Sequence, residues 1–367
     1  MSNYKPYPAY KNSGVEWIGD VPEHWDIARI KHASSLRTSR CTDAPDDSQY
    51  IGLEDVESGT GQYRPTKGSA RQNEDSTVGV FRSGDVLYGK LRPYLKKTII
   101  SDADGVCSTE FLVLQPKTVL APWLHQWLLT TGVTQQIEAG CEGTKMPRAD
   151  WEHVGSIHVP LPDESEQAEI ISVLDCETKR ISSLITKKTR FIELLKEKRK
   201  ALITHAVTKG LDPNVKMKDS GVEWIGEVPE DWRVCSLGYI TRSSTGGTPD
   251  RKVDSYWNGS IPWAKTGEIR YETISKTEEF ITLEGLSNSA AFIAEPGTIL
   301  MAMYGKIKVP VPPYDEQLSI IKRLVCQLQK LEALESRALK TIDLLKERRS
   351  AFITAAVTGQ IDLRESV

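Results

Sequence analysis

The stretch that decides the organisation of this chain is Ser13-Gly-Val-Glu-Trp-Ile-Gly-Asp-Val-Pro-Glu-His-Trp25, because it occurs twice. It returns as Ser220-Gly-Val-Glu-Trp-Ile-Gly-Glu-Val-Pro-Glu-Asp-Trp232, at an offset of 207 residues. A second stretch, which begins at Ile192 with Glu-Leu-Leu-Lys-Glu, returns from Ile342 at an offset of only 150 residues. Long repeats at fixed offsets are typical of a duplicated architecture, so the sequence predicts a tandem duplication.

Each half has a mixed front part and a helical back part. Val159-Pro-Leu-Pro162 precedes Glu166-Gln167, and Val309-Pro-Val-Pro312 precedes Glu316-Gln317 in the same way. Proline and the residue before it disfavour helix, so each proline motif predicts an extended segment that leads into a helix. From Glu164 to His205 the sequence contains neither glycine nor proline, which allows a helix of about forty residues, or roughly 60 Å. Gly210 and Gly359 follow the two helical patterns, where glycine caps are expected.

Apolar residues in both helical segments follow heptad spacing, which predicts a coiled-coil pair. The alternative is two helices that are each buried in their own domain. The predicted contact residues are Leu174, Ile181, Leu184, Phe191, Leu195 and Leu202 in the first helix, and Leu324, Leu331, Ala338, Leu345 and Phe352 in the second.

The front parts carry the pattern of α+β domains built from short strands. Tyr50–Val56 and Asp85–Tyr88 predict strands with glycine-rich turns between them, and Glu268-Ile269 and Thr298–Met301 are their expected counterparts. The expected division is a front domain over residues 1–160, a helix over 161–209, a second front domain over 210–310, a second helix over 311–360, and a tail over 361–367.

The second front domain is shorter than the first. Gly84 and Gly297 match at an offset of 213, but Val159 and Val309 match at an offset of 150, so 63 residues of the first half have no counterpart. The junction falls at Gly305–Lys306, and it is either a true deletion or a place where a segment is left out of the numbered sequence. A true deletion predicts a defective second domain.

Composition narrows the class of protein. A chain of 367 residues with 39% hydrophobic and 26% charged residues predicts more than one globular domain. The net charge of −3 excludes a histone-like coat of cations, although local basic faces for nucleic acid remain compatible with it. No stretch has the length of a membrane span, and six cysteines without a CxxC pair favour a reducing cytoplasm over a disulfide framework or a metal site.

The chain resembles the specificity subunits of type I restriction-modification systems over nearly its whole length. The repeated Gly-Val-Glu-Trp-Ile-Gly-x-Val-Pro-Glu-x-Trp openers, the two helix entries and the two Leu-Leu-Lys-Glu helix ends carry this resemblance. Further matching segments are Thr245–Pro249, Tyr256-Trp257, Ile261–Trp263 and Gly297–Gly305.

This resemblance implies two target-recognition domains that each read one half of a split DNA site, held apart by two antiparallel helices. It also implies two modification subunits, which carry S-adenosylmethionine and methylate adenine, and restriction subunits, which use ATP and Mg²⁺. This chain itself is expected to hold no cofactor and no metal. Matched helices would present equivalent docking surfaces to identical partners, while diverged front domains would read unlike half-sites.

The motifs that catalysis would need are missing. Adenine methylation needs an acidic or amide side chain before Pro-Pro-aromatic, and the segment Val311-Pro-Pro-Tyr314 offers valine there. No GxxxxGK[ST] phosphate loop occurs, and the six histidines show no zinc-ligand spacing. We therefore expect no catalytic residues, and the competing hypothesis is a coiled-coil adaptor that joins protein partners without reading DNA.

Candidate DNA contacts are cations, threonines and tyrosines in turn-rich segments, because arginine and lysine bridge guanine while hydroxyl groups hold phosphate. In the first front domain they are Arg37, Arg40, Tyr88, Lys90, Arg92, Tyr94, Lys145 and Arg148, and in the second Thr245, Thr248, Lys265, Thr266 and Tyr304. Trp17, Trp25, Trp224 and Trp232 are identical between the halves, so we expect them to pack in the interior.

Overall fold

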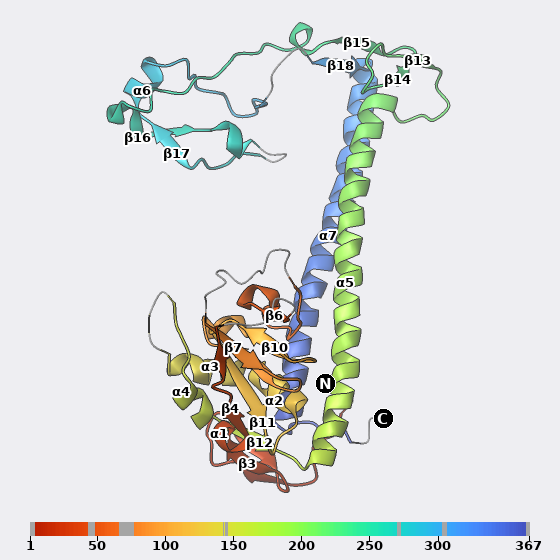
Figure 1. Cartoon of the computed structure of the whole chain (residues 1–367). Coiled ribbons are helices and arrows are strands. Elements are labelled where there is room, and N and C mark those ends of the chain that lie inside the picture. The colour runs from red at the N-terminus through yellow and green to blue at the C-terminus, as the bar shows by residue number, and fades with distance from the viewer. Residues whose placement is uncertain are drawn as a thin grey trace. The chain divides into compact units, whose positions relative to one another are not determined.

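The computed structural model describes residues 4–42, 48–65, 77–141, 143, 146–269, 273–302 and 307–364. It divides into two compact units. The first unit contains residues 1–193 and 335–367, and the second contains residues 194–334. Two helices, α5 (Glu164–Lys209) and α7 (Tyr314–Val357), contribute to both units (Figure 1).

The first unit is mixed α and β. Its strands are β1 (Tyr10–Asn12), β2 (Asp20–Pro22), β3 (Asp26–Arg29), β4 (Ser34–Leu36), β5 (Arg40–Cys41), β6 (Tyr50–Ile51), β7 (Val78–Phe81), β8 (Val86–Gly89), β9 (Thr98–Ile100), β10 (Gly105–Cys107), β11 (Phe111–Pro116) and β12 (His158–Leu161). Its helices, besides parts of α5 and α7, are α1 (Ile30–Ala33), α2 (Ala121–Leu128), α3 (Thr131–Ala139) and α4 (Trp151–Ser156), with 3-10 turns at Leu53–Asp55 and Pro93–Leu95.

Two four-stranded sheets form the frame of this unit, in the orders β5-β7-β10-β6 and β4-β11-β8-β9. In the second of these sheets β11 lies antiparallel to β8, with Leu112 opposite Tyr88 and Leu114 opposite Val86. All four residues of β8 are buried, as expected for a strand that is covered on both faces. The predicted strand at Asp85–Tyr88 is confirmed, whereas Tyr50–Val56 becomes a two-residue strand followed by a 3-10 turn.

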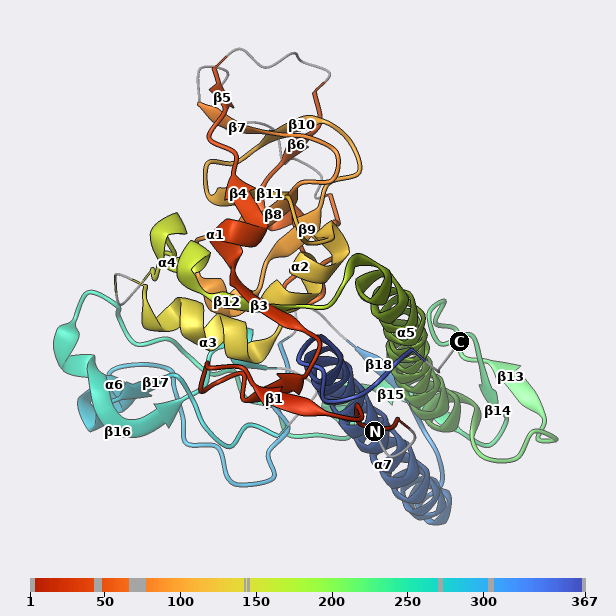
Figure 2. The ribbon, with the colours of Figure 1, turned by 90° about the horizontal axis from the view of Figure 1, so that it is seen from below.

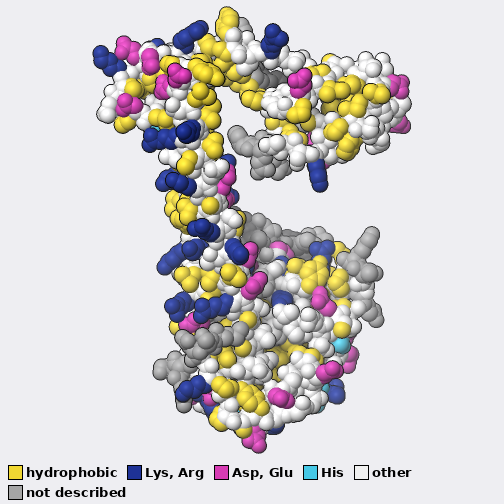
Figure 3. Space-filling view, turned by 180° about the vertical axis from the view of Figure 1, so that it is seen from behind, with side chains coloured by type: hydrophobic (Ala, Val, Ile, Leu, Met, Phe, Trp, Pro, Cys, Tyr) yellow, Lys and Arg dark blue, Asp and Glu magenta, His cyan; other side chains and the backbone are white. Residues whose placement is uncertain are grey.

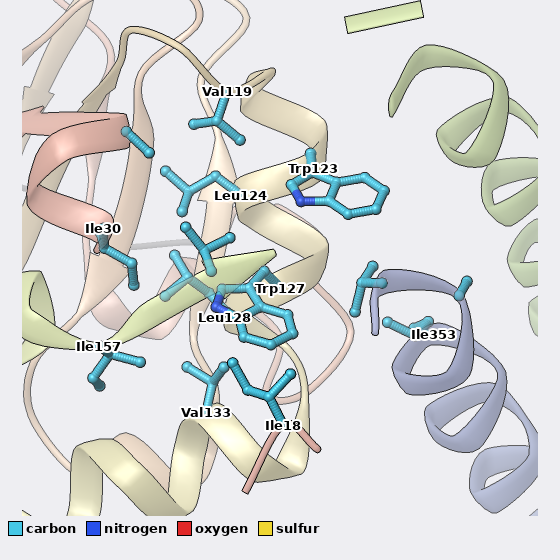
Figure 4. Close-up of a cluster of buried hydrophobic side chains, with 14 of the residues drawn as sticks. Ile18, Ile30, Val119, Trp123, Leu124, Trp127, Leu128, Val133, Ile157 and Ile353 are labelled. Atoms are coloured by element: carbon cyan, nitrogen blue, oxygen red, sulfur yellow. The ribbon is translucent and has the colours of Figure 1, made fainter. Parts of the chain in front are cut away.

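The main core of the first unit lies between the sheet β4-β11-β8-β9, helix α2 and the end of α7. Figure 4 shows Trp123 and Trp127 of α2 packed among aliphatic side chains, with Ile353 of α7 nearby. Both indole rings are fully buried, and their Nε1 groups donate to the carbonyl oxygens of Pro160 and His158. These hydrogen bonds satisfy the polar atom of each ring, so burial of the large ring surface is stabilising.

Several elements of the second unit stand at positions that the two sequence offsets relate to elements of the first. In the second unit β13 (Met217–Asp219) and β14 (Glu227–Pro229) repeat the β1–β2 hairpin, residue for residue at the offset of 207. The β3–β12 pair is repeated by β15 (Arg233–Ser236) and β18 (Lys308–Val311), which again pair antiparallel. The proline motifs lie in β12 and β18, directly before the two long helices, as their sequence predicts.

Each long helix ends at a glycine that contacts a repeated hairpin. Gly210 and Gly359 have φ angles of +77° and +71°, the left-handed conformation that glycine adopts without strain. The main chain at Gly359 approaches Pro22 and Trp25 in the first unit, and Gly210 approaches Pro229 and Trp232 in the second. The predicted caps are therefore confirmed, and each one closes against a fully buried tryptophan.

The first and last described segments of the chain lie side by side in the first unit. Lys5 forms an antiparallel bridge with Asp362, and the Tyr10 hydroxyl donates to the carbonyl of Gly359. Figure 2 shows β1 beside the end of α7. Ile361 and Leu363 are buried in the core, so the segment after α7 is part of the packed domain.

Apolar side chains of α5 and α7 meet within each unit. In the first unit Ile192 clusters with Ala338 and Ile342, and in the second Ala206 clusters with Ile320. Among the predicted contact residues, the buried ones are Leu174, Ile181, Leu195, Leu331, Ala338 and Phe352, and the half-buried ones are Leu202, Leu324 and Leu345.

Leu184 and Phe191 do not belong to this interface, which corrects the predicted heptad. Each is 40% exposed, and the neighbouring residues Ile185 and Ile192 occupy the inward positions instead. The reason is geometric. In a heptad, inward residues follow one another at steps of four and three residues. A step of four from Ile181 leads to Ile185, and a further heptad leads to Ile192, one residue beyond the predicted Leu184 and Phe191.

The second unit contains few regular elements besides the repeated hairpins. They are β16 (Trp257–Trp263) paired with β17 (Glu279–Ile281), helix α6 (Leu283–Ser287), and 3-10 turns at Leu237–Tyr239, Asp254–Tyr256 and Thr266–Glu268. Two predictions are wrong here: Thr298–Met301 forms no strand, and Glu268-Ile269 lies at the end of a 3-10 turn. Among the described helices of the chain, none has the length and apolar content that a membrane span needs.

Candidate nucleic-acid interface

Two of the predicted DNA contacts are interior residues of the first unit, which corrects their assignment. Arg37 donates from Nε and Nη2 to the two carboxylate oxygens of Asp85, at 2.7 and 3.1 Å, and its side chain is only 12% exposed. This hydrogen bond raises the pKa of the Arg37 guanidinium. Tyr88 is 1% exposed within the main core, and burial raises the pKa of its hydroxyl. Tyr88 is thus enclosed in the core, and the Arg37 guanidinium is held by Asp85.

Three further candidates, Lys90, Arg92 and Arg148, lie together where two segments distant in the sequence run side by side. The Arg92 amide donates to the Pro147 carbonyl at 2.9 Å, and Leu91 forms an antiparallel bridge with Arg148. The Ala149 amide donates to the Lys90 carbonyl at 2.8 Å. Residues 90–92 and 147–149 therefore form one short ladder, which we call the cationic ladder.

Lys90, Arg92 and Arg148 supply the positive charge of the cationic ladder, and Glu110 is the acidic residue among them. Nη2 of Arg148 donates to Oε1 of Glu110 at 2.5 Å, while the Lys90 amide donates to the Glu110 carbonyl. Desolvation lowers the pKa of the Lys90 ammonium. The charge of Glu110 acts in the opposite direction, while the charges of Arg148 and Arg40 lower the pKa further. Several cations beside one acidic residue leave an excess of positive charge, which favours an anionic ligand.

The backbone at the cationic ladder is held in an uncommon conformation. Arg92 has φ +53° and Lys96 has φ +48°, the left-handed region that costs a non-glycine residue roughly 1–2 kcal/mol. Strain of this kind persists only where the surroundings impose it, and here the buried Pro93 and the 3-10 turn Pro93–Leu95 lie between the two residues. The turn places Tyr94 at the surface, where it is 49% exposed.

Arg40 and Glu110 lie close enough to the cationic ladder for their charges to act on Lys90. Arg40 is exposed on β5, and its charge reaches Lys90. Sequence reasoning missed Glu110, whose Oε2 is buried with no hydrogen-bond partner among the described residues. The sequence carries no local signal for Glu110, because only the backbone pairing of Lys90 with Glu110 brings this carboxylate beside the cations.

The candidates of the second front domain have different surroundings. Thr245, Thr248 and Thr266 are exposed, whereas Lys265 binds the carboxylates of Glu278 and Glu279 at 2.8 and 3.0 Å. Trp263 donates to the Gly247 carbonyl, which brings the threonine-rich segment to the end of β16. Lys265 is therefore neutralised by its neighbours, and no excess of cations like that of the first unit is found among the described residues here.

A tryptophan pair near these residues holds another cation, Arg251. The Arg251 guanidinium lies 4.1 Å from the Trp257 ring and 5.3 Å from the Trp263 ring, and it binds Glu279 at 2.8 Å. Such a stack resembles the aromatic and cationic surfaces that bind the bases of single-stranded nucleic acids. Here, however, the Arg251 guanidinium is already paired with Glu279 and with both indole rings.

Lys145, Tyr304 and the junction at Gly305–Lys306 lie outside the described residues. Within the described ranges, no three His, Cys, Asp or Glu side chains are grouped closely enough to hold a metal ion.

No protein-family model matches the chain. It is 26% identical over 171 residues to the type I restriction enzyme EcoDI specificity subunit of Escherichia coli, which is 45% of this chain and 38% of that protein. It is 23% identical over 347 residues to the MjaVIII specificity subunit of Methanocaldococcus jannaschii, which is 87% of this chain and 74% of that protein. The match thus spans less than half the length of the E. coli relative.

Two solved structures share the fold of this chain. One chain from a study of assembly and conformational transition in the type I restriction-modification system gives a TM-score of 0.68 at 18% identity, covering 95% of this chain and 99% of that one. The HsdS subunit from Thermoanaerobacter tengcongensis gives 0.50 at 17% identity, covering 93% and 98%. In sequence over most of its length, and in fold, the chain is therefore a relative of the specificity subunits of type I restriction enzymes.

Proposed function

We propose that the chain is the DNA-reading subunit of a type I restriction-modification enzyme and that its first front domain contacts DNA through the cationic ladder. One observation carries this proposal: Lys90, Arg92 and Arg148, from segments more than fifty residues apart, meet at one surface where Glu110 is the acidic residue that pairs with Arg148. Arginine side chains can contact both phosphate and guanine, so such a surface supports positioning and base reading together.

The helices α5 and α7 are proposed to be an antiparallel coiled coil that spaces two half-readers. Support comes from the pairing of Ile192 with Ala338 and Ile342 and of Ala206 with Ile320, in which residue numbers rise along one helix as they fall along the other. Between two intact readers, each 10–10.5 base pairs of separation would correspond to about 34–36 Å along the DNA.

The outward faces of these helices are proposed to dock two modification subunits. Leu184 and Leu334 are 40% and 42% exposed, and Leu194 and Leu344 are 46% and 56% exposed. The members of each pair are related by the offset of 150, so the duplication presents the same apolar side chains twice. Equivalent surfaces suit two identical partners, and exposed apolar side chains suit protein contacts.

The proposed role is non-catalytic. Adenine methylation with S-adenosylmethionine belongs to the modification subunits, and cleavage with ATP and Mg²⁺ belongs to the restriction subunits. The six cysteines are all free, which suits the reducing cytoplasm where such an enzyme would work.

The test is selection from a randomised duplex library by the full chain with its modification subunit, followed by sequencing of the retained DNA. We expect a single half-site motif, because the second front domain is shortened. A split motif with a fixed gap would instead show that both readers work. Retention without any motif would favour the adaptor hypothesis.

Single substitutions test whether the cationic ladder is the surface that binds DNA. Arg92→Ala and Arg148→Ala should each weaken binding, and each should lower the slope of log K against log salt by about 0.9 for every DNA phosphate that the arginine neutralises. Tyr88→Phe, in the core beneath the ladder, and Lys179→Ala, an exposed cation on α5, are the controls and should leave the affinity unchanged. Equal losses of affinity in all four variants would contradict the assignment to the ladder.

A further inference from the structure

The second front domain lacks the segment that covers its counterpart. In the first unit, β8 pairs with β11 and β9, and β7 pairs with β10. Strands β9, β10 and β11 all lie between Arg92 and Ser156, the region that accounts for the 63 missing residues. The counterpart of β8, residues 299–302, therefore lacks both of the strands that β8 pairs with. The counterpart of β7, residues 291–294, lacks one of two, since β7 also pairs with β5, and neither segment is a strand.

The consequence is visible in the exposure of matched side chains. Val86, Leu87 and Tyr88 are at most 1% exposed, whereas their counterparts Ile299, Leu300 and Met301 are 90%, 39% and 46% exposed. Ile293, next to Phe292 in the counterpart of β7, is 69% exposed. Apolar side chains that the fold normally encloses thus lie on the surface of the second unit.

The repeated opener shows the same difference. Trp17 stacks on Trp127 of α2 with ring centroids 5.5 Å apart, and it also contacts Gly132 of α3. Its counterpart Trp224 is 68% exposed, so the prediction that Trp224 packs in the interior is wrong. The reason is that the counterparts of α2 and α3 are missing.

The exposed segments carry almost no charge. From Gly285 to Ala302, Glu295 is the only charged residue. Figure 3 shows hydrophobic side chains gathered over the part of the second unit that carries β16, β17 and α6. A surface of this kind neither attracts nucleic acid nor repels a copy of itself, and unpaired backbone beside it is a template for strand addition.

We propose that the second front domain is a self-association surface, on which residues 298–302 of one chain pair antiparallel with residues 298–302 of a second copy. An antiparallel pair about a two-fold axis brings identical segments together, with residue 299 of one copy opposite residue 301 of the other. Each copy thereby supplies the neighbouring strand that the other lacks. The uncharged segment favours this homotypic partner over a charged one, and main-chain pairing does not depend on matched side chains.

The experiment measures the mass of the full chain by sedimentation equilibrium over a range of concentrations. Wild-type chain is expected to form a dimer, and Ile299→Asp should raise its dissociation constant at least about tenfold, because it would bury two carboxylates in the interface. Ile299 is 90% exposed within one chain, so this variant should leave the monomer fold intact. Leu344→Asp makes the same change at a 56% exposed site on α7 and serves as the control.

Hydrogen exchange gives an independent measurement without DNA. In the dimer, the amides of residues 298–302 should exchange more slowly than in the diluted monomer, and Ile299→Asp should abolish the difference. A monomer at every concentration, open-ended aggregation, or a dimer that Leu344→Asp breaks and Ile299→Asp does not, would each overturn the proposal. The first of these outcomes would direct attention to a different polypeptide as the cover.

Discussion

Two arginines of the first unit show how surroundings set the role of a residue. Arg37 and Arg148 both bind a carboxylate, but the Arg37 side chain is 12% exposed and that of Arg148 is 56% exposed. The buried pair with Asp85 is fixed by two hydrogen bonds and joins the residue after β4 to the residue before β8. The exposed pair with Glu110 is weak enough to exchange for a ligand.

Arg37→Ala should destabilise the first unit by about 3 kcal/mol, because it leaves the buried Asp85 carboxylate without its partner. Chemical denaturation of the full chain, followed by the fluorescence of the buried tryptophans, measures this change. Arg40→Ala, three residues along the chain and exposed, should shift the free energy of unfolding by less than about 0.5 kcal/mol. Equal stability of the two variants would show that the Arg37–Asp85 pair contributes little.

His125 makes stability depend on pH. Burial lowers the pKa of its imidazole to about 4, and Nε2 lies 3.2 Å from the Thr98 carbonyl oxygen. The folded state therefore holds a neutral ring, while the unfolded chain takes up a proton near pH 6.5. The stability from this group is present above pH 6.5 and is lost as pH falls toward 4, by about 3 kcal/mol in all.

This dependence is measured as the free energy of unfolding between pH 7 and pH 4. His125→Gln retains an N–H group that can donate to the Thr98 carbonyl but has no ionisable ring, so its stability should fall less over this interval. An unchanged slope in His125→Gln would assign the effect to other groups.

At the scale of elements, the ends of the long helices are specified by close packing as much as by helix propensity. A Cβ atom at Gly359 would lie 2.2 Å from Cδ of Pro22, whereas one at Gly14 would have no atom within 4 Å. The two glycines have φ angles of +71° and +72°, so their backbone strain on substitution is the same. They differ only in the space around them.

Gly14→Ala should therefore cost about 1 kcal/mol of stability, the strain of a left-handed alanine. Gly359→Ala should cost about 3 kcal/mol or more, because the end of α7 must also move away from the β1–β2 hairpin. Both residues belong to the first unit, so one set of denaturation curves compares them directly. Similar destabilisation of the two variants would mean that the close approach at Pro22 relaxes without cost.

At the scale of the whole molecule, the two long helices are followed by similar connections. After α5, the chain passes through Gly210 and the exposed residues Asp212 and Asn214 into the second hairpin. After α7, it passes through Gly359 to Asp362, which pairs with Lys5 at the entry to the first hairpin. The connection after α5 thus runs through residue 212 directly into the second hairpin. After α7, the pairing of residue 362 with residue 5 brings the chain to the first hairpin in a similar way, but without a covalent connection.

A circular permutant, with residues 364 and 4 joined by a short glycine linker and new ends opened at Asp212–Pro213, should consequently fold. Its free energy of unfolding should lie within about 1–2 kcal/mol of the parent, since the linker joins segments that already pair and the cut falls in exposed chain. Circular dichroism and denaturation provide the measurement. A permutant without helix content would show that the 210–214 connection itself is needed for folding.

The sequence by itself determined the duplication, the two long helices with their glycine ends, the proline-marked strands before them and the resemblance to specificity subunits. These features are local or periodic, so they depend on propensity and spacing within short stretches of chain. Tyr88 and Arg37 show the limit of that information, because they have the composition of ligand-binding residues, and only their neighbours across the sheet make them interior residues.

Only the tertiary structure decided which candidate residues meet. It joined Arg92 to Pro147 and Arg148 to Glu110, and it placed Ile185 and Ile192, in place of Leu184 and Phe191, at the helix interface. It also showed why Thr298–Met301 forms no strand despite its β-forming sequence. Strand formation depends on hydrogen-bond partners from elsewhere in the chain, and the partners that β8 finds in β9 and β11 have no counterpart in the second half.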